Sequence, residues 1–232
     1  MKTALVTGAN RGIGLELVHQ LKHTGHIVIA CCRDAEAAKG LGPVADKVIQ
    51  IDVRKDHDIY NLVQALKDRP IDLLINNAGV IGEREATLKF MGSEDSENRE
   101  SFLEVLDVNC VSVIQLSTAL LPNIQASQDK NILVISSTMG SISENQQGGY
   151  YAYRASKSAV NAAMRSFAID VAPLGVHVML IHPGWVKTRM GGTDALIEAS
   201  ESVAGILKQA ELYFSDSHAA ELRRFDGGVI AW

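Results

Sequence analysis

The sequence predicts a single-domain α/β fold, a doubly wound parallel sheet of about seven strands with helices on both faces. Short apolar runs, of the length of strands buried on both sides of a sheet, alternate with segments whose apolar residues recur at helical spacing. A glycine-rich turn separates the first apolar run from the first helical segment. The 232 residues, 47% of them hydrophobic, can bury one large core, so no second domain is needed.

Composition and charge exclude several classes of function. The formal net charge is −5 and no segment is rich in Lys and Arg, so we expect no nucleic acid and no membrane as a partner. Cys31 and Cys32 are adjacent among three cysteines, which indicates reduced thiols and neither a disulfide framework nor a zinc site. No apolar run is long enough to span a bilayer, and a first strand from Thr3 leaves no room for a signal peptide. We therefore expect a soluble cytoplasmic protein without a metal.

The first strand, Thr3 to Val6, leads into a turn suited to a diphosphate. Glycines without a Cβ let the backbone N–H groups at a helix N-terminus approach such an anion. The GxxxGxG spacing differs from the GxGxxG dinucleotide fingerprint, but the strand-then-helix context is the same. A tight turn without a ligand is the alternative. The residues of this turn are Gly8, Asn10, Arg11, Gly12, Ile13 and Gly14.

The second strand, His26 to Cys32, is expected to end beside the adenosine ribose of a dinucleotide. NAD sites place a carboxylate there, whereas the 2′-phosphate of NADP requires a cation. Cys32 occupies the expected carboxylate position and Arg33 follows it, while Arg11 offers a second cation. The pattern favours NADP(H), although Asp34 is the acidic residue if the register is shifted by two.

The next two strands end in polar residues that lie at the same sheet edge. Val48 to Ile51 is followed by Asp52, which either accepts from an adenine amino group or caps the helix Asp56 to Lys67. Ile71 to Ile75 is followed by Asn76 to Gly79, with paired amides that could bridge backbone and ribose and a glycine that permits close approach. Taken alone, this second segment is also compatible with a simple turn.

The middle of the chain predicts a solvated connection and a long helix. Ile81 to Ser101 is rich in charge and poor in apolar residues, which indicates a mobile connection without chemistry. A helix from about Ser101 to Ser127 follows, with Asn109 inside it and a kink at Pro122. A lone Asn in such a helix is usually a satisfied core residue or marks a kink.

A strand, Ile132 to Ile135, precedes a serine pair and the most distinctive pair of residues in the chain. Tyr153 and Lys157 stand four residues apart at the start of a helical segment, so they share one helix face. A fixed positive charge beside a phenol favours the phenolate and lowers its pKa. Such a tyrosine could move a proton to or from a reacting oxygen. Taken alone, however, the two residues favour an ordinary interface aromatic beside a solvated lysine.

The C-terminal third predicts two strands and a helix. The strands are Val176 to His182 and Leu222 to Ile230, the latter with a turn or kink at Asp226-Gly227-Gly228. The helix is Glu201 to Tyr213. His182 is interpreted as structural, because the proton-transfer role already has a candidate.

In their order and spacing, these motifs resemble the short-chain dehydrogenase/reductase family over nearly the whole chain. The glycine turn, Asp52, the Asn76 to Gly79 segment, Asn109, Ser137 and the Tyr153/Lys157 pair follow in the family's order. The segment Pro183-Gly184-Trp185-Val186-Lys187-Thr188 matches the family's PGxVxT motif. The stretch GGYYAYRASK and the ending FDGGVIAW are most similar to the small carbonyl-reductase branch with sniffer-like and C-factor-like proteins.

The resemblance implies a Rossmann-type NADP-binding domain over residues 1–232 with a short substrate region at about 185–215. It implies hydride transfer between NADP(H) and a carbonyl or alcohol, with Tyr153 as general acid/base and Lys157 lowering its pKa and binding the nicotinamide ribose. Ser137 polarises the substrate oxygen, and Asn109 holds a water of a proton relay. The implied cofactor contacts are Gly8, Asn10, Arg11, Gly12, Ile13, Gly14, Arg33, Asp52, Val53, Asn77, Ala78, Gly79, Tyr153, Lys157, Pro183, Gly184, Val186 and Thr188.

Two departures from the family pattern affect these expectations. Sixteen residues separate Ser137 from Tyr153, more than is common in the family, so the loop Ser141 to Gly149 must bulge and Ser136 competes as the substrate-side serine. Few residues separate Thr188 from the next helix, which suggests a small or absent lid.

Three further matters stay open at the level of sequence. We expect a homodimer or homotetramer through the helices around Asn109 and after Tyr153, which commonly pack between subunits in this family. The alternative functions are an NADP-binding regulatory or signalling protein with little turnover, and an NAD-dependent alcohol dehydrogenase. The physiological substrate cannot be assigned from the sequence.

Overall fold

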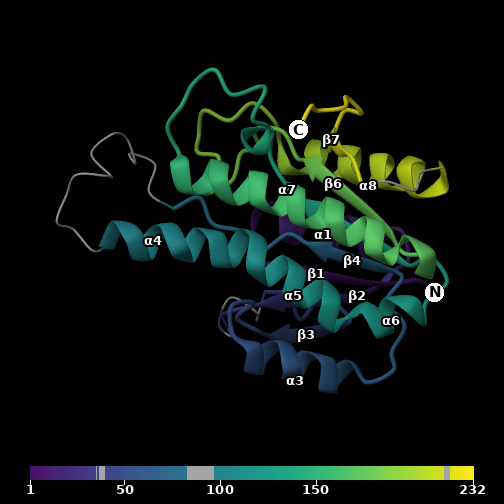
Figure 1. The fold of residues 1–232 in the computed structure, drawn as a ribbon. Coiled ribbons are helices and arrows are strands. Elements are labelled where there is room, and N and C mark those ends of the chain that lie inside the picture. Colours follow the sequence, from purple (N-terminus) through teal and green to yellow (C-terminus); the bar gives the residue numbers. More distant parts are fainter. Residues whose placement is uncertain (35, 37–39, 83–96, 217–219) are drawn as a thin grey trace.

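Seven parallel strands form one sheet in the order β3-β2-β1-β4-β5-β6-β7 (Figure 1). The structure is a computed structural model that describes residues 1–34, 36, 40–82, 97–216 and 220–232. The strand order reverses at β1, which pairs with β2 on one side and with β4 on the other. Such a reversal opens a crevice at the carboxyl ends of the strands. The strands are β1 (Thr3–Thr7), β2 (Ile27–Cys32), β3 (Lys47–Gln50), β4 (Leu73–Asn76), β5 (Asn131–Ile135), β6 (His177–His182) and β7 (Leu222–Arg224).

Helices cover both faces of the sheet, which confirms the doubly wound fold predicted from the sequence. One core lies under α3, α5 and α7, and the other lies under α1 and α8. Side chains of β1 alternate between them: Leu5 packs in the first core, and Ala4 and Val6 pack in the second. The helices are α1 (Gly12–His23), α3 (Asp56–Leu66), α4 (Glu97–Leu106), α5 (Ser112–Ala119), α6 (Leu121–Gln125), α7 (Tyr151–Val171) and α8 (Ala199–Asp216).

The long helix predicted from Ser101 to Ser127 is divided in the structure. It begins at Glu97 as α4, passes through a π-helical turn (Asp107–Val111) and continues as α5. It breaks at Leu120, where φ is −92° and ψ is 2°. The predicted kink is therefore present as a break just before Pro122, and this proline lies in the first turn of α6, where its missing N–H costs nothing.

The charged connection predicted from Ile81 to Ser101 is shorter than expected. Its last residues, Glu97 to Ser101, form the first turn of α4. The segment 83–96 lies outside the described residues. The prediction is therefore wrong at the C-terminal end of the connection. The charged residues there form a helix, because α4 packs against α7.

The helical run Arg99–Ala119 has the length and mean hydropathy, 1.3, of a candidate membrane span. This finding contradicts the prediction that no apolar run is long enough. Cys110, Val113 and Leu116 of this run belong to the core that α5 shares with α3 and α7. The apolar composition therefore serves the packing of the domain, as in other core helices.

The C-terminal strand is shorter than predicted. β7 ends at Arg224, and the chain turns at Asp226 to Gly228 and folds back, so that the Arg224 N–H donates to the Gly228 carbonyl at 2.7 Å. An antiparallel bridge joins Arg223 to Val229. The turn was predicted within one strand, but here it reverses the chain direction.

Candidate functional site

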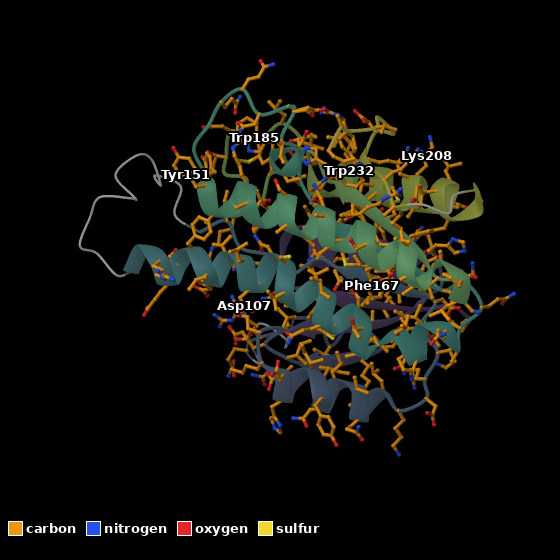
Figure 2. The ribbon with its side chains drawn as sticks, in the orientation of Figure 1. Asp107, Tyr151, Phe167, Trp185, Lys208 and Trp232 are labelled. Carbon is orange, nitrogen blue, oxygen red and sulfur yellow. The ribbon has the colours of Figure 1, made fainter. Side chains whose placement is uncertain are left out.

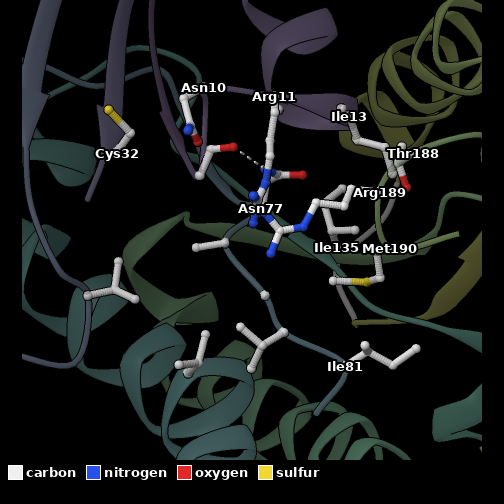
Figure 3. A pocket seen from close by; sticks show the side chains of 18 of the residues that line it. Asn10, Arg11, Ile13, Cys32, Asn77, Ile81, Ile135, Thr188, Arg189 and Met190 are labelled. Atoms are coloured by element: carbon white, nitrogen blue, oxygen red, sulfur yellow. Dashed lines mark hydrogen bonds between the residues drawn. The ribbon is translucent and has the colours of Figure 1, made fainter. Parts of the chain in front are cut away.

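A cavity of about 740 Å³ opens at the carboxyl ends of the central strands, a size within the range of ligand-binding clefts (Figure 3). Among the predicted cofactor contacts, only Gly184 and Val186 do not line it. Gly184 has a φ of 85° and packs against Phe225, and Val186 is buried beside Ile197. The lining residues from the predicted set are Gly8, Asn10, Arg11, Gly12, Ile13, Gly14, Arg33, Asp52, Val53, Asn77, Ala78, Gly79, Tyr153, Lys157, Pro183 and Thr188.

The glycine turn is built so tightly that side chains cannot replace two of its glycines. Gly8 has a φ of 62°, and a Cβ there would lie 2.9 Å from the Cα of Ala78. A Cβ at Gly14 would collide with the Gly8 carbonyl oxygen and lie 2.5 Å from Asn77 Nδ2. The N-cap residue of α1 is Arg11, whose side chain makes no capping hydrogen bond. Uncapped N–H groups at a helix N-terminus suit a phosphate anion, so the turn fits the diphosphate of a dinucleotide.

Thr7 and Asn77 tie the glycine turn to the end of β4. The Thr7 hydroxyl accepts from the backbone N–H groups of Asn77 and Ala78, both at 3.0 Å. Asn77 Nδ2 donates to the carbonyls of Thr7 and Gly8 at 2.8 and 3.2 Å. Sequence reasoning missed Thr7, although a threonine at the end of the first strand was a visible signal. Asn76 does not join Asn77 at the cavity, because its amide donates to Ser117 on α5 at 3.1 Å.

At the far end of the cavity, the ends of β2 and β3 bring acidic and basic groups together. Cys32, Arg33 and Asp34 all line the cavity, so the structure presents both the predicted cation and the competing carboxylate. Asp52 also lines it, but its carboxylate accepts from the Arg54 guanidinium at 2.7 and 3.1 Å and from the Arg54 N–H at 3.1 Å. These bonds lower the pKa of Asp52.

The environment of Asp52 decides whether this residue caps the helix that follows it, one of the two roles that the sequence left open. Asp52 does not cap α3, whose N-cap residue is Lys55. Its backbone N–H instead donates to the carboxylate of Asp58 on α3 at 2.8 Å. Arg54, which also pairs with Glu104 of α4, was missed from the sequence because the Glu104 contact joins residues 50 positions apart.

Tyr153 and Lys157 both lie buried on the cavity side of α7, as their spacing predicts. The Lys157 ammonium donates to the Ile135 carbonyl at 2.8 Å and lies 5.7 Å from the centroid of the Tyr153 ring. Burial lowers the pKa of Lys157 to about 8. The two side chains therefore share one face of the helix, with the ammonium anchored on the end of β5.

The predicted direction of the Tyr153 pKa shift is wrong for this structure. Burial of the phenol raises its pKa to about 12, and a hydrogen bond with the Ser137 side chain opposes this only in part. Burial wins because the phenolate is poorly solvated there, while the Lys157 ammonium is directed to a backbone carbonyl. Tyr153 is thus a neutral phenol at neutral pH, a group that holds a proton ready to donate.

The two serines at the end of β5 have different partners. The Ser137 side chain lies beside the Tyr153 phenol, where it opposes the rise in the pKa of the tyrosine, and its hydroxyl accepts from the Met139 N–H at 3.1 Å. Ser136 lines the cavity, but its hydroxyl donates to Asn161 Oδ1 on α7 at 2.6 Å. The hydroxyl that faces the tyrosine is therefore that of Ser137, and the hydroxyl of Ser136 fastens β5 to α7.

Asn109 lies in the π-helical turn and is 1% exposed. Its amide accepts from the Val80 N–H at 2.9 Å and donates to the Val80 carbonyl at 2.8 Å and to the Ser156 hydroxyl at 3.0 Å. A Cβ at Gly79 would lie 3.3 Å from Asn109 Oδ1 and 4.0 Å from Lys157 Nζ, which places Gly79 between the two. The side chain of Asn109 therefore holds the chain after β4 beside Lys157.

The longer loop before Tyr153 is attached to the C-terminal end of the chain. Ser143 donates through its N–H and its hydroxyl to the Trp232 carbonyl, at 3.4 and 3.1 Å, and Glu144 pairs with Arg224. Figure 2 shows Trp232 and Tyr151 on the same side of the molecule as this loop. The loop enters α7 through Tyr150, whose φ of 50° is left-handed. The predicted bulge is thus accommodated by a left-handed entry and a C-terminal support.

The predicted substrate region at about 185–215 combines two different kinds of structure. Residues 185–198 form an irregular connection, in which the Trp185 indole donates to the Gly191 carbonyl at 2.8 Å. From Ala199 onward the chain is α8, whose Val203 and Ile206 are fully buried in the second core. The part that borders the cavity is therefore the connection, through Lys187 to Met190.

The chain is similar in sequence and in structure to known proteins. The family model for short chain dehydrogenases matches residues 2–196. The C-signal protein of Myxococcus xanthus is 36% identical over 163 residues, which are 70% of this chain and 93% of that protein. The carbonyl reductase Sniffer of D. melanogaster superposes with a TM-score of 0.86 at 32% identity, covering all of both chains. An NADPH-bound carbonyl reductase from chicken fatty liver has a TM-score of 0.83 at 32% identity, covering 100% of this chain and 99% of that one.

Proposed function

The chain belongs to the short-chain dehydrogenase/reductase family, and within it we propose that this protein is an NADPH-dependent reductase of aldehydes or ketones. The observation that carries the proposal is Tyr153, a buried phenol beside the Ser137 side chain, at a cavity that also contains the glycine turn. A proton donor, a second hydroxyl and a diphosphate cradle are the groups that carbonyl reduction requires.

Each residue has a role that its contacts support. Ser137 donates to the carbonyl oxygen of the substrate and polarises it, and Tyr153 gives its proton to the same oxygen as negative charge develops there. Lys157 keeps a positive charge near the phenol, which favours the loss of that proton. NADPH, when bound, supplies the hydride to the carbonyl carbon. Asn109 positions Gly79 and Val80 beside Lys157, and we propose that the water of the predicted relay is held in this turn.

The residues of the cavity fit a dinucleotide phosphate. The uncapped N-terminus of α1 and Arg11 would hold the diphosphate, and Arg33 at the end of β2 would hold the 2′-phosphate. NADPH in the chicken carbonyl reductase and NADP in a Burkholderia multivorans relative of 28% identity support this choice of cofactor. Asp34 lies at the same end of the cavity and is the group that would favour NAD instead.

The pH dependence of the reaction follows from Lys157. Its pKa of about 8 means that the ammonium is charged below that pH and neutral above it. We expect kcat/KM for carbonyl reduction to fall as the pH rises through about 8, because the charge that assists proton loss from Tyr153 disappears. In Lys157→Met the rate should be low and should show no such fall between pH 7 and 9. A wild-type profile that still rises above pH 9 contradicts this role.

A second candidate is a cofactor-binding signalling protein with little turnover, which the similarity to C-signal favours. Tyr153 and Lys157 line one cavity and the Ser137 side chain lies beside the phenol, an arrangement that speaks for catalysis. NADPH oxidation with a panel of aldehydes, ketones and quinones separates the two. We expect turnover with at least one compound and a much lower rate with NADH. Tight binding of NADPH without oxidation across the panel would favour signalling, and faster turnover with NADH would favour an NAD-dependent dehydrogenase.

Two accompanying expectations concern the state of the protein in the cell. We propose a homodimer or homotetramer that assembles through α4 and α7, which contact each other within one chain and leave Leu103 and Ile169 exposed. We also propose a cytoplasmic location, from the cysteine content and the acidic composition.

A further inference from the structure

Residues 183–192 form a tightly bonded loop after β6. The Thr188 hydroxyl accepts from the Gly191 N–H at 3.0 Å, and the Thr188 carbonyl accepts from the Gly192 N–H at 2.9 Å. The Trp185 indole closes the same turn by donating to the Gly191 carbonyl at 2.8 Å. A Cβ at Gly191 would collide with the Val186 carbonyl oxygen, so only glycine fits there. The conformation of the loop is therefore set by its own contacts.

This loop lies over the N-terminus of α1. A Cβ added to Gly12, the first residue of α1, would lie 3.1 Å from the Thr188 methyl group. The residue after Thr188 is Arg189, which lines the cavity together with Met190. Figure 3 shows Arg189 and Arg11 both extending into the cavity, one from the loop and one from the glycine turn.

The charges that line the cavity are distributed unevenly. Its two acidic lining residues among the described part of the chain, Asp34 and Asp52, follow β2 and β3, and Asp52 is bonded to Arg54. Arg11 and Arg189 instead belong to the segments that meet at the N-terminus of α1. A guanidinium group presents several N–H donors in a planar fork that matches the oxygens of a phosphate. The diphosphate of a dinucleotide is an anion of two negative charges that the N-terminus of α1 also attracts.

We infer that Arg189 is a further cofactor-binding residue, which contacts the diphosphate of the dinucleotide from the side opposite Arg11. The inference rests on the proposed dinucleotide binding at this cavity. Its role differs from that of Arg33, which is assigned to the 2′-phosphate at the other end of the cavity. Because NAD and NADP share the diphosphate and differ only in the 2′-phosphate, the two arginines can be told apart by their effect on the two ligands.

The test is isothermal titration calorimetry of NADP⁺ and NAD⁺ with the wild type, Arg189→Gln, Arg189→Lys and Arg33→Gln. Loss of a charge-assisted contact to phosphate should weaken binding about 10- to 100-fold. Arg189→Gln should weaken both ligands by the same factor, and Arg189→Lys should weaken both by a smaller one, since lysine keeps the charge and loses the fork. Arg33→Gln should weaken NADP⁺ alone.

A matched control removes one positive charge elsewhere. Lys208→Gln changes an exposed lysine of α8 outside the cavity lining, and it should leave both affinities unchanged (Figure 2). Unchanged affinities in Arg189→Gln, or a loss confined to NADP⁺, would overturn the inference while leaving dinucleotide binding intact. A wild type that binds neither ligand would instead overturn the proposed function itself.

Discussion

Tyr153→Phe is expected to lower kcat for carbonyl reduction by about 10²- to 10⁴-fold, the contribution typical of a positioned general acid. The phenylalanine ring fills the same buried space and removes only the hydroxyl that carries the proton. Affinity for NADPH should stay within a factor of about two, because the glycine turn and the N-terminus of α1 are untouched. Initial rates of NADPH oxidation and a fluorescence titration of NADPH measure the two quantities.

Tyr151→Phe provides the matched control for this substitution. Tyr151 opens the same helix, is 41% exposed and does not line the cavity, so loss of its hydroxyl should leave kcat near the wild-type value. Full activity of Tyr153→Phe would contradict the assignment of the proton donor. An equal loss in both variants would show that the effect is a general disturbance of the start of α7.

Gly14→Ala is expected to abolish tight NADPH binding, with at least a tenfold loss of affinity, and to lower stability by about 1 to 3 kcal/mol. The added methyl group collides with the Gly8 carbonyl oxygen and crowds the Asn77 amide that holds the glycine turn. Both neighbours must move, so the turn that faces the diphosphate changes shape. Thermal unfolding without ligand and NADPH titration of the same preparation give the two effects.

Gly25→Ala separates the loss of cofactor binding from the loss of stability. Gly25 has a φ of 83°, so alanine there is strained, but its Cβ would meet nothing within 4 Å. This variant should be less stable than the wild type and should bind NADPH with unchanged affinity. Unaltered NADPH affinity in Gly14→Ala would show that the cofactor does not bind against this turn.

The fold could be predicted from the sequence because its signals are local and repeated. Apolar runs such as that of β2 are continuous because all but its first residue are buried in the sheet interior. The glycine turn indicated the position of the crevice. The backbone segments approach so closely at Gly8 and Gly14 that a Cβ would not fit there. The ends of the strands were less predictable. For example, β7 is only three residues long because the chain after it folds back, and this reversal depends on tertiary packing.

Most of the predicted cofactor contacts line the cavity, whereas the electrostatics of the site could not be predicted. The direction of the pKa shift of Tyr153 depends on how deeply its phenol is buried and on which group the Lys157 ammonium contacts. The four-residue spacing of the two side chains determines neither. The contact of Thr7 with Asn77 depends on side-chain geometry at the ends of separate strands, and that of Asp52 with Arg54 depends on side-chain geometry in the loop after β3. The two serines likewise became distinguishable only when α7 supplied Asn161 as a partner for Ser136.

The most direct test of the account is a label-transfer measurement with the wild-type protein. NADPH deuterated at the transferable position of the nicotinamide ring is incubated with a carbonyl compound that supports turnover, and the alcohol is analysed by mass spectrometry. We expect one deuterium on the carbinol carbon of each alcohol molecule and one NADP⁺ formed for each alcohol. NADPH that binds at the cavity but is never oxidised by any carbonyl compound would contradict the proposed reductase activity.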